Sequence, residues 1–426
     1  MPGVRGRVPR ARGRGVRAVL AALLAAVLGG SAASCVLGAS SAQPPSPSGT
    51  GAACPGTPGV TADEVRVGLL YPDSGNAASL FAPFRAGVEA RLGVANSAGG
   101  VHGRRVTYLR QDDGSQPATN RAAARTLVEQ RQVFGIMEST TASAGSAEYL
   151  HSKGVPVTGT SLDSAWTVYD NMFSYSNMIA DGSSVSTWGD FVAEQGGRTA
   201  LIVLTSLSAA SGEFADELRA SLEIAGVRVV GTVDATGPIN LRAIGDQVRD
   251  SGADTLVGAV TGTAFGQVVL GAHAAGAKLR VILTPSGYDQ SMLKLFGPIL
   301  AGVNLFVDYQ PFELELPGHR AFLEAMARYA PYLPTANQQA ALSGWITADM
   351  FLRGLSAAGP CPTRQRFVEG LRAVRDYSAD GLLPEPIDFA TSFGELGRCY
   401  TFMRVSSDGT RFEVLRPAPR CGTLRS

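Results

Sequence analysis

The hydrophobic pattern alternates short apolar runs with longer segments of helical spacing. Residues 65–71 form a β-rich run that ends in a cluster of turn formers, and apolar residues then recur at helical spacing over 81–95. A second apolar run, 106–110, ends at the polar pair Asp112 and Asp113. This order predicts a parallel α/β unit with polar residues at the C-terminal ends of its strands, where ligands bind in such sheets.

The same alternation continues to residue 176 and restarts at 201–204. Further strands are expected at 133–137, 155–158, 227–233, 255–260, 280–283, 304–309, 400–405 and 412–415, and helices near 118–130, 144–153, 213–225, 240–250, 264–275, 321–329 and 338–355. Repeated βα units predict parallel sheets with helices on both faces. The expected fold is therefore α/β, with two doubly wound Rossmann-like lobes.

The first 34 residues have the pattern of a secretory signal peptide. Six arginines precede an apolar run at 18–28, and small residues lead to Cys35. Small residues before a cysteine resemble a bacterial lipobox, so we predict lipidation of Cys35 and anchoring to the outer face of the cell membrane. Cleavage by ordinary signal peptidase, for instance after Ala42, is the alternative. Residues 35–60, rich in Ser, Pro, Gly and Ala, are predicted to be a disordered tether.

Charge and cysteine content indicate an exported, mildly acidic protein. Loss of residues 1–34 removes six of the 37 basic residues and none of the 36 acidic ones, which argues against nucleic-acid binding. The remaining cysteines, Cys54, Cys361, Cys399 and Cys421, predict two disulfides in an oxidising compartment. Of the three possible pairings we favour Cys361–Cys399 with Cys54–Cys421, because the second bond would join the two ends of the folded part.

The segment 72–113 resembles the extracellular solute-binding proteins of the branched-chain amino acid type. The matching positions are Pro72, Ser74, Gly75, Asn96, Gly99, Gly100, Gly103, Arg104, Asp112 and Asp113. The resemblance implies a periplasmic binding protein-like type I fold, in which a multi-strand hinge joins the lobes, and capture of a small solute for an ABC permease. We expect residues 61–176 with 310–378 in the first lobe, and 177–309 with 379–426 in the second.

Hydroxyl groups at strand ends are the predicted ligand contacts of the first lobe. Ser139 and Thr140 follow a strand and precede a helix, where hydroxyls and free helix N–H groups can receive a carboxylate. The resemblance implies that this loop binds the ligand's carboxylate and that the loop at Thr160 makes a second set of contacts. The predicted residues are Ser74, Ser139, Thr140, Thr158, Thr160 and Ser161. Helix capping and self-satisfied turns are the alternatives.

The second lobe departs from the resemblance. Ser211 stands where the family commonly has a tyrosine, so an amino-acid ligand would lack one stacking wall. Tyr288 is predicted to supply an aromatic face instead, and Asp289 to pair with a ligand ammonium. Capping of the following helix is the alternative role for Asp289. Thr261 is the remaining predicted contact.

Signatures of catalysis are missing from the sequence. It contains no G-x-S-x-G elbow, no Walker loop and no H-E-x-x-H, and its four histidines are scattered. No enzyme activity, metal or cofactor is expected. We predict a monomeric binding protein for an amino acid, amide or related carboxylate. A sensor of the same fold, a degenerate surface interaction protein and a hydrolase on this scaffold are the alternatives.

Overall fold

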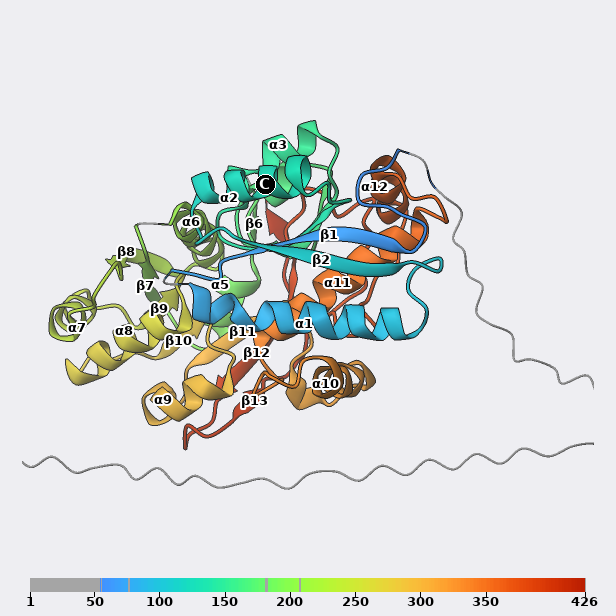
Figure 1. The fold of residues 1–426 in the computed structure, drawn as a ribbon. Helices are drawn as coiled ribbons and strands as arrows, with labels where there is room; N and C mark the ends of the chain where they lie inside the picture. The colour runs from blue at the N-terminus through green and yellow to red at the C-terminus, as the bar shows by residue number, and fades with distance from the viewer. Residues whose placement is uncertain (1–53, 55, 76, 181–182, 207, 426) are drawn as a thin grey trace, which may run out of the picture. The chain divides into compact units, whose positions relative to one another are not determined.

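The computed structural model describes residues 54, 56–75, 77–180, 183–206 and 208–425, which form two sheets flanked by helices (Figure 1). The predicted signal peptide, the lipidation site Cys35 and the tether up to residue 53 lie outside the described residues. No helix within the described part is both long and apolar enough to cross a membrane.

The first sheet has five parallel strands. These are β1 (Glu64–Tyr71), β2 (Arg105–Asp112), β3 (Ile136–Ser139), β4 (Val157–Ser161) and β5 (Met172–Asn177), in the order β2-β1-β3-β4-β5. All four residues of β3 and five successive residues of β1 are buried, as expected for a parallel sheet that is covered on both faces. All five C-terminal strand ends therefore lie along one edge.

Helices cover both faces of this sheet (Figure 1). One layer contains α1 (Ala78–Ser97), α10 (Pro317–Tyr329) and α11 (Gln339–Ala357), with α12 (Arg364–Arg372) beside α11. The other layer contains α2 (Pro117–Arg125) with a π-helical turn at Thr126–Gln130, a 3-10 turn at Ser143–Gly145, α3 (Ala147–Ser152) and α4 (Ala165–Val168). Helices α1 and α11 approach closely because a Cβ on Gly87 would collide with the carbonyl of Ala341.

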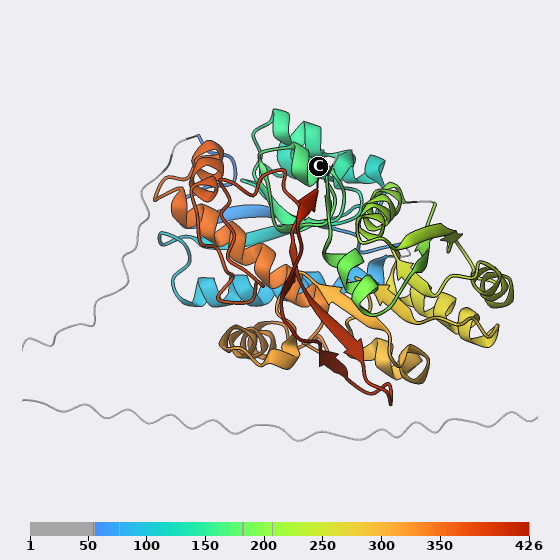
Figure 2. The ribbon, with the colours of Figure 1, turned by 180° about the vertical axis from the view of Figure 1, so that it is seen from behind.

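The second sheet has eight strands. They are β7 (Thr199–Leu204), β8 (Arg228–Asp234), β9 (Thr255–Gly258), β10 (Val281–Thr284), β11 (Asn304–Val307), β12 (Cys399–Val405), β13 (Phe412–Val414) and β14 (Arg420–Cys421). The order is β13-β12-β11-β10-β9-β7-β8, and β14 pairs with β12. The C-terminal strands, red in Figure 2, close one edge: β12 runs antiparallel to β11, and β13 runs antiparallel to β12.

The helices of the second lobe are α5 (Thr187–Glu194), α6 (Ala209–Ile224), α7 (Leu241–Asp250), α8 (Gly262–Ala274) and α9 (Gln290–Leu300), and the short strands β6 (Ser184–Val185) and β15 (Leu424–Arg425) pair with each other. The sequence predicted most of these elements. It missed α4, α5, α12 and the strand β5, among others, and it started β3 too early, since the regular strand begins only at Ile136. The exact lobe boundaries stay a prediction.

The disulfides differ from the favoured pairing, which was wrong. Cys54 bonds to Cys361 and Cys399 bonds to Cys421, with Cα atoms 5.3 and 4.0 Å apart. The register of β12 and β14 places Cys399 directly opposite Cys421. The Cys399–Cys421 bond therefore follows from the pairing of β12 with β14. The Cys54–Cys361 bond follows from the packing of the residue at the start of the described fold against a loop. Neither bond joins the two ends of the chain.

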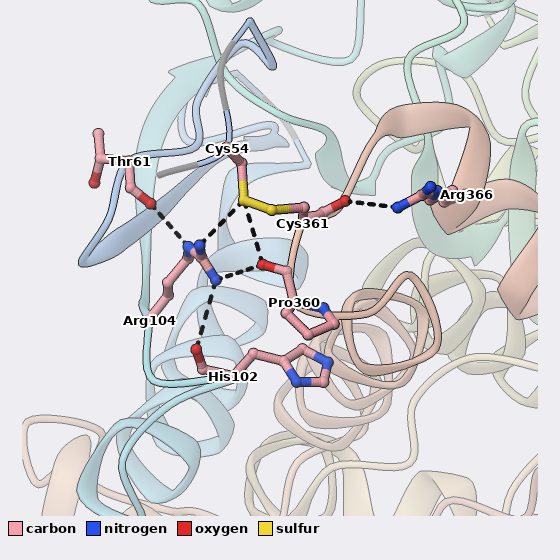
Figure 3. Close-up of a disulfide and its surroundings, with 7 residues drawn as sticks. All are labelled: Cys54, Thr61, His102, Arg104, Pro360, Cys361 and Arg366. Carbon is pink, nitrogen blue, oxygen red and sulfur yellow. Dashed lines mark hydrogen bonds between the residues drawn. A yellow bond between two sulfur atoms is a disulfide. The ribbon is translucent and has the colours of Figure 1, made fainter. Parts of the chain in front are cut away.

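Buried Arg104 fixes the surroundings of the Cys54–Cys361 bond (Figure 3). Its guanidinium donates to the carbonyls of Thr61 and Pro360 at 2.8 and 2.7 Å, and it lies 3.2 Å from the Cys54 sulfur. The start of the described fold is thus held against the loop before α12 by one covalent bond and several hydrogen bonds.

Candidate functional site

Two of the predicted residues, Ser139 and Thr160, meet at the C-terminal edge of the first sheet. The parallel register of β3 and β4 sets them side by side, and the Ser139 hydroxyl donates to Thr160 Oγ1 at 3.3 Å. Ser139 is buried and Thr160 is partly exposed. Both side chains point to the face covered by α1 and α11, because side chains two residues apart share a face and Thr158 bonds the backbone of α11.

Tyr175, at the end of β5, continues this hydroxyl chain. Its hydroxyl lies 2.9 Å from Ser343 Oγ on α11, and the Thr160 side chain is near enough to lower its pKa slightly. Burial raises the pKa of Tyr175 well above its ordinary value, and the nearby charge of Asp308 raises it further. The hydroxyl therefore stays protonated at every physiological pH and remains a donor.

Asp308 brings an acidic group to the same place from the second sheet. It follows β11 directly, where the chain crosses back toward the first lobe, and it is partly buried. Desolvation raises the pKa of Asp308 to about 6, although Ser176 hydrogen-bonds the carboxylate. No ion pair involves Asp308 among the described residues. A carboxylate without a cationic partner thus lies beside the hydroxyl chain.

The other predicted residues of the first lobe have different surroundings. The Thr158 hydroxyl donates to the carbonyl of Thr347 at 3.1 Å, so it ties the sheet to α11. The hydroxyls of Thr140 and Ser161 are buried and have no hydrogen-bond partner in the described part of the chain. Ser74 is exposed beside Asp112; desolvation opposes ionisation of Asp112, but hydrogen bonds from Ser74 and nearby amides lower its pKa overall.

In the second lobe, Ser211 and Thr261 stabilise loops. The Ser211 hydroxyl accepts from the amide of Thr205 at 2.9 Å and donates to the carbonyl of Ala259 at 2.6 Å, so it joins the ends of β7 and β9. Thr261 is the N-cap of α8, where its hydroxyl accepts from the amide of Ala264. Both side chains already have protein partners.

Tyr288 and Asp289 are engaged in the same way. Only 3% of Tyr288 is exposed, and its hydroxyl donates to Glu313 at 2.5 Å and accepts from the amide of Phe312 at 2.8 Å. The structure places it in the core because it packs between Phe312 and neighbouring aromatic rings. Asp289 caps α9 by accepting from the amide of Ser291 at 2.7 Å, which confirms the alternative role named above.

A group of buried carboxyls lies on the opposite face of the first sheet. The Asn120 amide donates to Asp113 at 3.0 Å and to Glu138 at 2.8 Å, and Asp163 lies on the next loop. Burial raises the pKa of Glu138 to about 8, and the charges of Asp113 and Asp163 raise it further. Burial also raises the pKa of Asp163 to about 6, with a contribution from Glu213.

Hydrogen bonds also join the two lobes near this edge. The amide of Ser164, after β4, donates to the carboxylate of Glu213 on α6 at 3.0 Å. The side-chain amide of Gln339, at the start of α11, donates to the carbonyl of Pro285 after β10 at 3.4 Å. Elements from both sheets therefore touch beside the strand ends that carry the candidate site.

Two other features do not contribute to the site. A surface pocket of about 410 Å³ lies beside the Cys54–Cys361 bond, and none of the predicted ligand residues lines it. Glu385, Cys399 and Cys421 are close enough to suggest a metal site, but both cysteines form a disulfide and offer no thiolate.

Sequence reasoning missed Tyr175, Ser343 and Asp308. Tyr175 lies in β5, from which the chain leaves the first sheet. Asp308 directly follows β11, from which the chain returns to the first lobe. Their residue types gave no signal, because a tyrosine or aspartate after a strand is common. The usable signal was position, since crossing segments necessarily pass between the two sheets.

Comparison with known proteins identifies the family. The sequence matches the family described as periplasmic binding protein over residues 64–410. The chain therefore belongs to the periplasmic binding protein family, and the family resemblance seen in the sequence is confirmed. A curated relative, the Leu/Ile/Val-binding protein homolog 3 of Brucella melitensis, is 24% identical over 235 residues, which cover 54% of this chain and 60% of that protein. The match thus spans less than two thirds of the relative's length.

Solved structures show the same fold. The substrate-binding protein LivJ of Streptococcus pneumoniae, in complex with isoleucine, aligns with a TM-score of 0.69 at 15% identity over 83% of this chain and all of its own. A solute-binding protein of R. palustris, in complex with 4-hydroxybenzoate, aligns with a TM-score of 0.70 at 17% identity over 84% of this chain and 98% of its own. The predicted two-lobed α/β fold is confirmed.

Proposed function

We propose that this protein is the substrate-binding component of an ABC importer, and that its solute carries both a carboxylate and a nitrogen donor. The observation that carries the proposal is the meeting of the Ser139–Thr160–Tyr175 hydroxyl chain with the unpaired carboxylate of Asp308. Hydroxyl donors suit the carboxylate of the solute. Asp308 suits an ammonium or amide nitrogen, because a charged acceptor pairs best with a charged or polar donor.

The two structural relatives sharpen this choice of solute. Isoleucine and 4-hydroxybenzoate share a carboxylate, and only isoleucine has an ammonium group. An aromatic acid would leave Asp308 desolvated without a cationic partner, and such a charge is costly to bury. We therefore place an amino acid or amide ahead of an aromatic carboxylate.

Binding would act through hinge closure. A solute that contacts the ends of β3, β4 and β5 and also Asp308 after β11 touches both lobes, so its differential contacts stabilise the closed form. The Ser164–Glu213 contact supports this, because it joins the lobes where closure would bring them together. The membrane permease would then recognise the closed form.

Export and anchoring belong to the same proposal. A signal peptide at residues 1–34 and lipidation of Cys35 would hold a monomeric receptor at the outer face of the membrane, in line with an extracytoplasmic family. The protein would deliver its solute unchanged, without enzyme activity.

A thermal-shift screen tests the proposal. Residues 36–426 with both disulfides formed would be screened against amino acids, amides, aromatic carboxylates and short peptides. A solute that binds only the folded state raises the unfolding temperature, and a hundredfold excess over its Kd stabilises the fold by about 2.7 kcal/mol. A saturable shift with amino acids or amides supports the proposal. A shift with aromatic acids alone contradicts the role of Asp308, and no shift at all favours a surface interaction protein.

A further inference from the structure

The ends of three strands place carboxyl groups in one buried cluster under the candidate site. Asp113 follows β2, Glu138 lies in β3 and Asp163 follows β4, and each is at most 3% exposed. Glu138 directly precedes Ser139, but successive side chains of a strand point to opposite faces. The cluster therefore lies on the α2 face of the sheet, while the hydroxyl chain lies on the α11 face.

The three carboxyls differ in the donors that they receive. Asp113 accepts from the amide of Ser115 at 2.9 Å and from Asn120, and Asp163 accepts from the amides of Ala144 and Ala165 at 3.0 and 3.2 Å. Glu138 Oε1 accepts only from Asn120.

Glu138 Oε2 has no hydrogen-bond partner among the described residues. Backbone N–H groups thus donate to both aspartates, whereas Glu138 receives none.

The groups that face Glu138 act in opposite directions, because Asn120 and Ser143 favour its carboxylate and the two aspartates oppose it. They are Asp113 from the β2 loop, Asn120 from α2, Ser143 from the 3-10 turn and Asp163 from the β4 loop. Arg121, the next residue on α2, turns instead to the carbonyl of Gly145 at 2.9 Å. Two carboxylates and full burial therefore both oppose ionisation of Glu138, whose pKa rises to about 8.

This cluster underlies the loop that begins with Ser139. Asp163 holds the amide of Ala144, and the Ser143 hydroxyl accepts from the indole of Trp166 at 3.2 Å, so residues 139–146 rest on the cluster. A proton on Oε2 would give Glu138 a donor toward Ser143. Loss of that proton would add a third negative charge below the loop.

We propose that Glu138 is a proton-binding positioning residue, which in its neutral form holds the 139–146 loop ready for a solute carboxylate and which weakens binding of that carboxylate when it ionises. The inference rests on the proposed function only for the ligand. The bound proton itself is a property of the free protein. The consequence is a receptor whose affinity for anions falls on the alkaline side of neutrality.

The first test needs no ligand. Because the folded state binds the Glu138 proton more tightly than the unfolded chain, wild-type stability should fall as pH rises from the ordinary glutamate range to about 8 and then level off. Glu138→Gln keeps a neutral side chain of the same size and should lose the part of this slope between pH 6 and 8, because Asp163 and Asp308 account for the part below, so its unfolding temperature should exceed that of the wild type by several degrees at pH 8 and above. Asp289→Asn, an exposed helix cap, should keep the wild-type slope. Equal slopes for Glu138→Gln and the wild type would overturn the proposal.

The second test uses isoleucine as the probe. Its Kd for the wild type should rise roughly fivefold or more between pH 7 and pH 9, a coupling of ordinary size, and should stay constant for Glu138→Gln. Parallel rises in both proteins would overturn the positioning role. If isoleucine fails to bind at any pH, the proposed ligand class is wrong, and the stability profile still decides the protonation of Glu138.

If Glu138→Gln does not fold, a titration of the wild-type protein alone tests whether Glu138 binds a proton. In protein labelled with carbon-13 at the glutamate carboxyl, one side-chain signal should titrate near pH 8. Because only glutamates carry the label, Asp163 does not interfere. Absence of any glutamate that titrates above pH 7 would overturn the proposal.

Discussion

The two lobes present very different polar residues at the edges where their parallel strands end. In the first lobe, the Ser139 hydroxyl bonds Thr160 and the Tyr175 hydroxyl bonds Ser343, and Thr140 and Ser161 have hydroxyls without partners in the described chain. In the second lobe, Ser211, Thr261 and Asp289 bond to their own lobe as loop clamps or helix caps, and buried Tyr288 bonds Phe312 and Glu313 in the segment that follows β11.

This difference distinguishes two roles of polar side chains at strand ends, which are ligand binding and stabilisation of the fold. A hydroxyl that bonds the backbone of its own lobe already has its partners and stabilises the fold. A hydroxyl chain that ends at an unpaired carboxylate has donors and acceptors left for a solute. We therefore expect substitutions in the first lobe and at Asp308 to change affinity, and those in the second lobe to change stability.

Asp308→Asn should give the largest change. Hydrogen bonds to charged groups contribute about 1.5–3 kcal/mol, so the Kd for isoleucine should rise about 10- to 100-fold. Stability of the free protein should not fall, because the substitution removes a desolvated charge. Isothermal titration and urea unfolding measure the two effects. If Asp308→Asn binds isoleucine with wild-type affinity, Asp308 does not contact the ligand, and the proposed difference between the lobes is wrong.

Tyr288→Phe should affect stability alone. The change leaves the amide of Phe312 without its acceptor, which costs about 1–3 kcal/mol of unfolding free energy in a buried setting. Urea unfolding measures this loss, and the Kd for isoleucine should be unchanged. A weakened Kd with full stability would instead return Tyr288 to the list of ligand contacts.

The pH dependence of affinity should show the role of Asp308 on the acidic side. Burial raises the pKa of Asp308 to about 6, so the carboxylate gains a proton as pH falls through that value and loses its attraction for an ammonium group. The Kd for isoleucine should rise several-fold from pH 7 to pH 5. Asp308→Asn should show no such rise in calorimetric titrations over the same range, and a rise of equal size there would assign the effect to another group.

Ser139→Ala should give the smallest change. One hydrogen bond between neutral groups contributes about 0.5–1.5 kcal/mol, so the Kd should rise about 2- to 10-fold with the fold intact. Ser211→Ala is the matched control in the second lobe, where the same substitution removes the clamp between Thr205 and Ala259 and should lower stability without changing affinity. Equal behaviour of the two variants would mean that Ser139 is also a structural hydroxyl.

Much of the fold could be predicted because apolar periodicity marks each strand and helix. The strand at 65–71, the helix that follows it and the strand at 106–110 correspond to β1, α1 and β2 with shifts of a few residues. Burial on both faces of a parallel sheet imposes this pattern locally. Such elements need no knowledge of distant contacts.

The site could be predicted only in part, because it combines residues that are far apart in the chain. Ser139 and Thr160 come from neighbouring βα units, whereas Ser343 and Asp308 reach the same place through crossings between the sheets. The disulfide pairing failed for the same reason. No local sequence pattern reveals that Cys54 lies against the loop of Cys361, which is 307 residues later in the chain.

The Cys54–Cys361 bond has a mechanical consequence. Hydrogen bonds at the start of a strand separate one at a time under tension, but a covalent bond transmits tension directly. A pull on the chain ahead of Cys54 therefore reaches the loop between α11 and α12 directly, and β1 shares the load with it. Tension in the N-terminal segment therefore acts first on the first lobe. It reaches the second lobe through the segments that connect the two lobes.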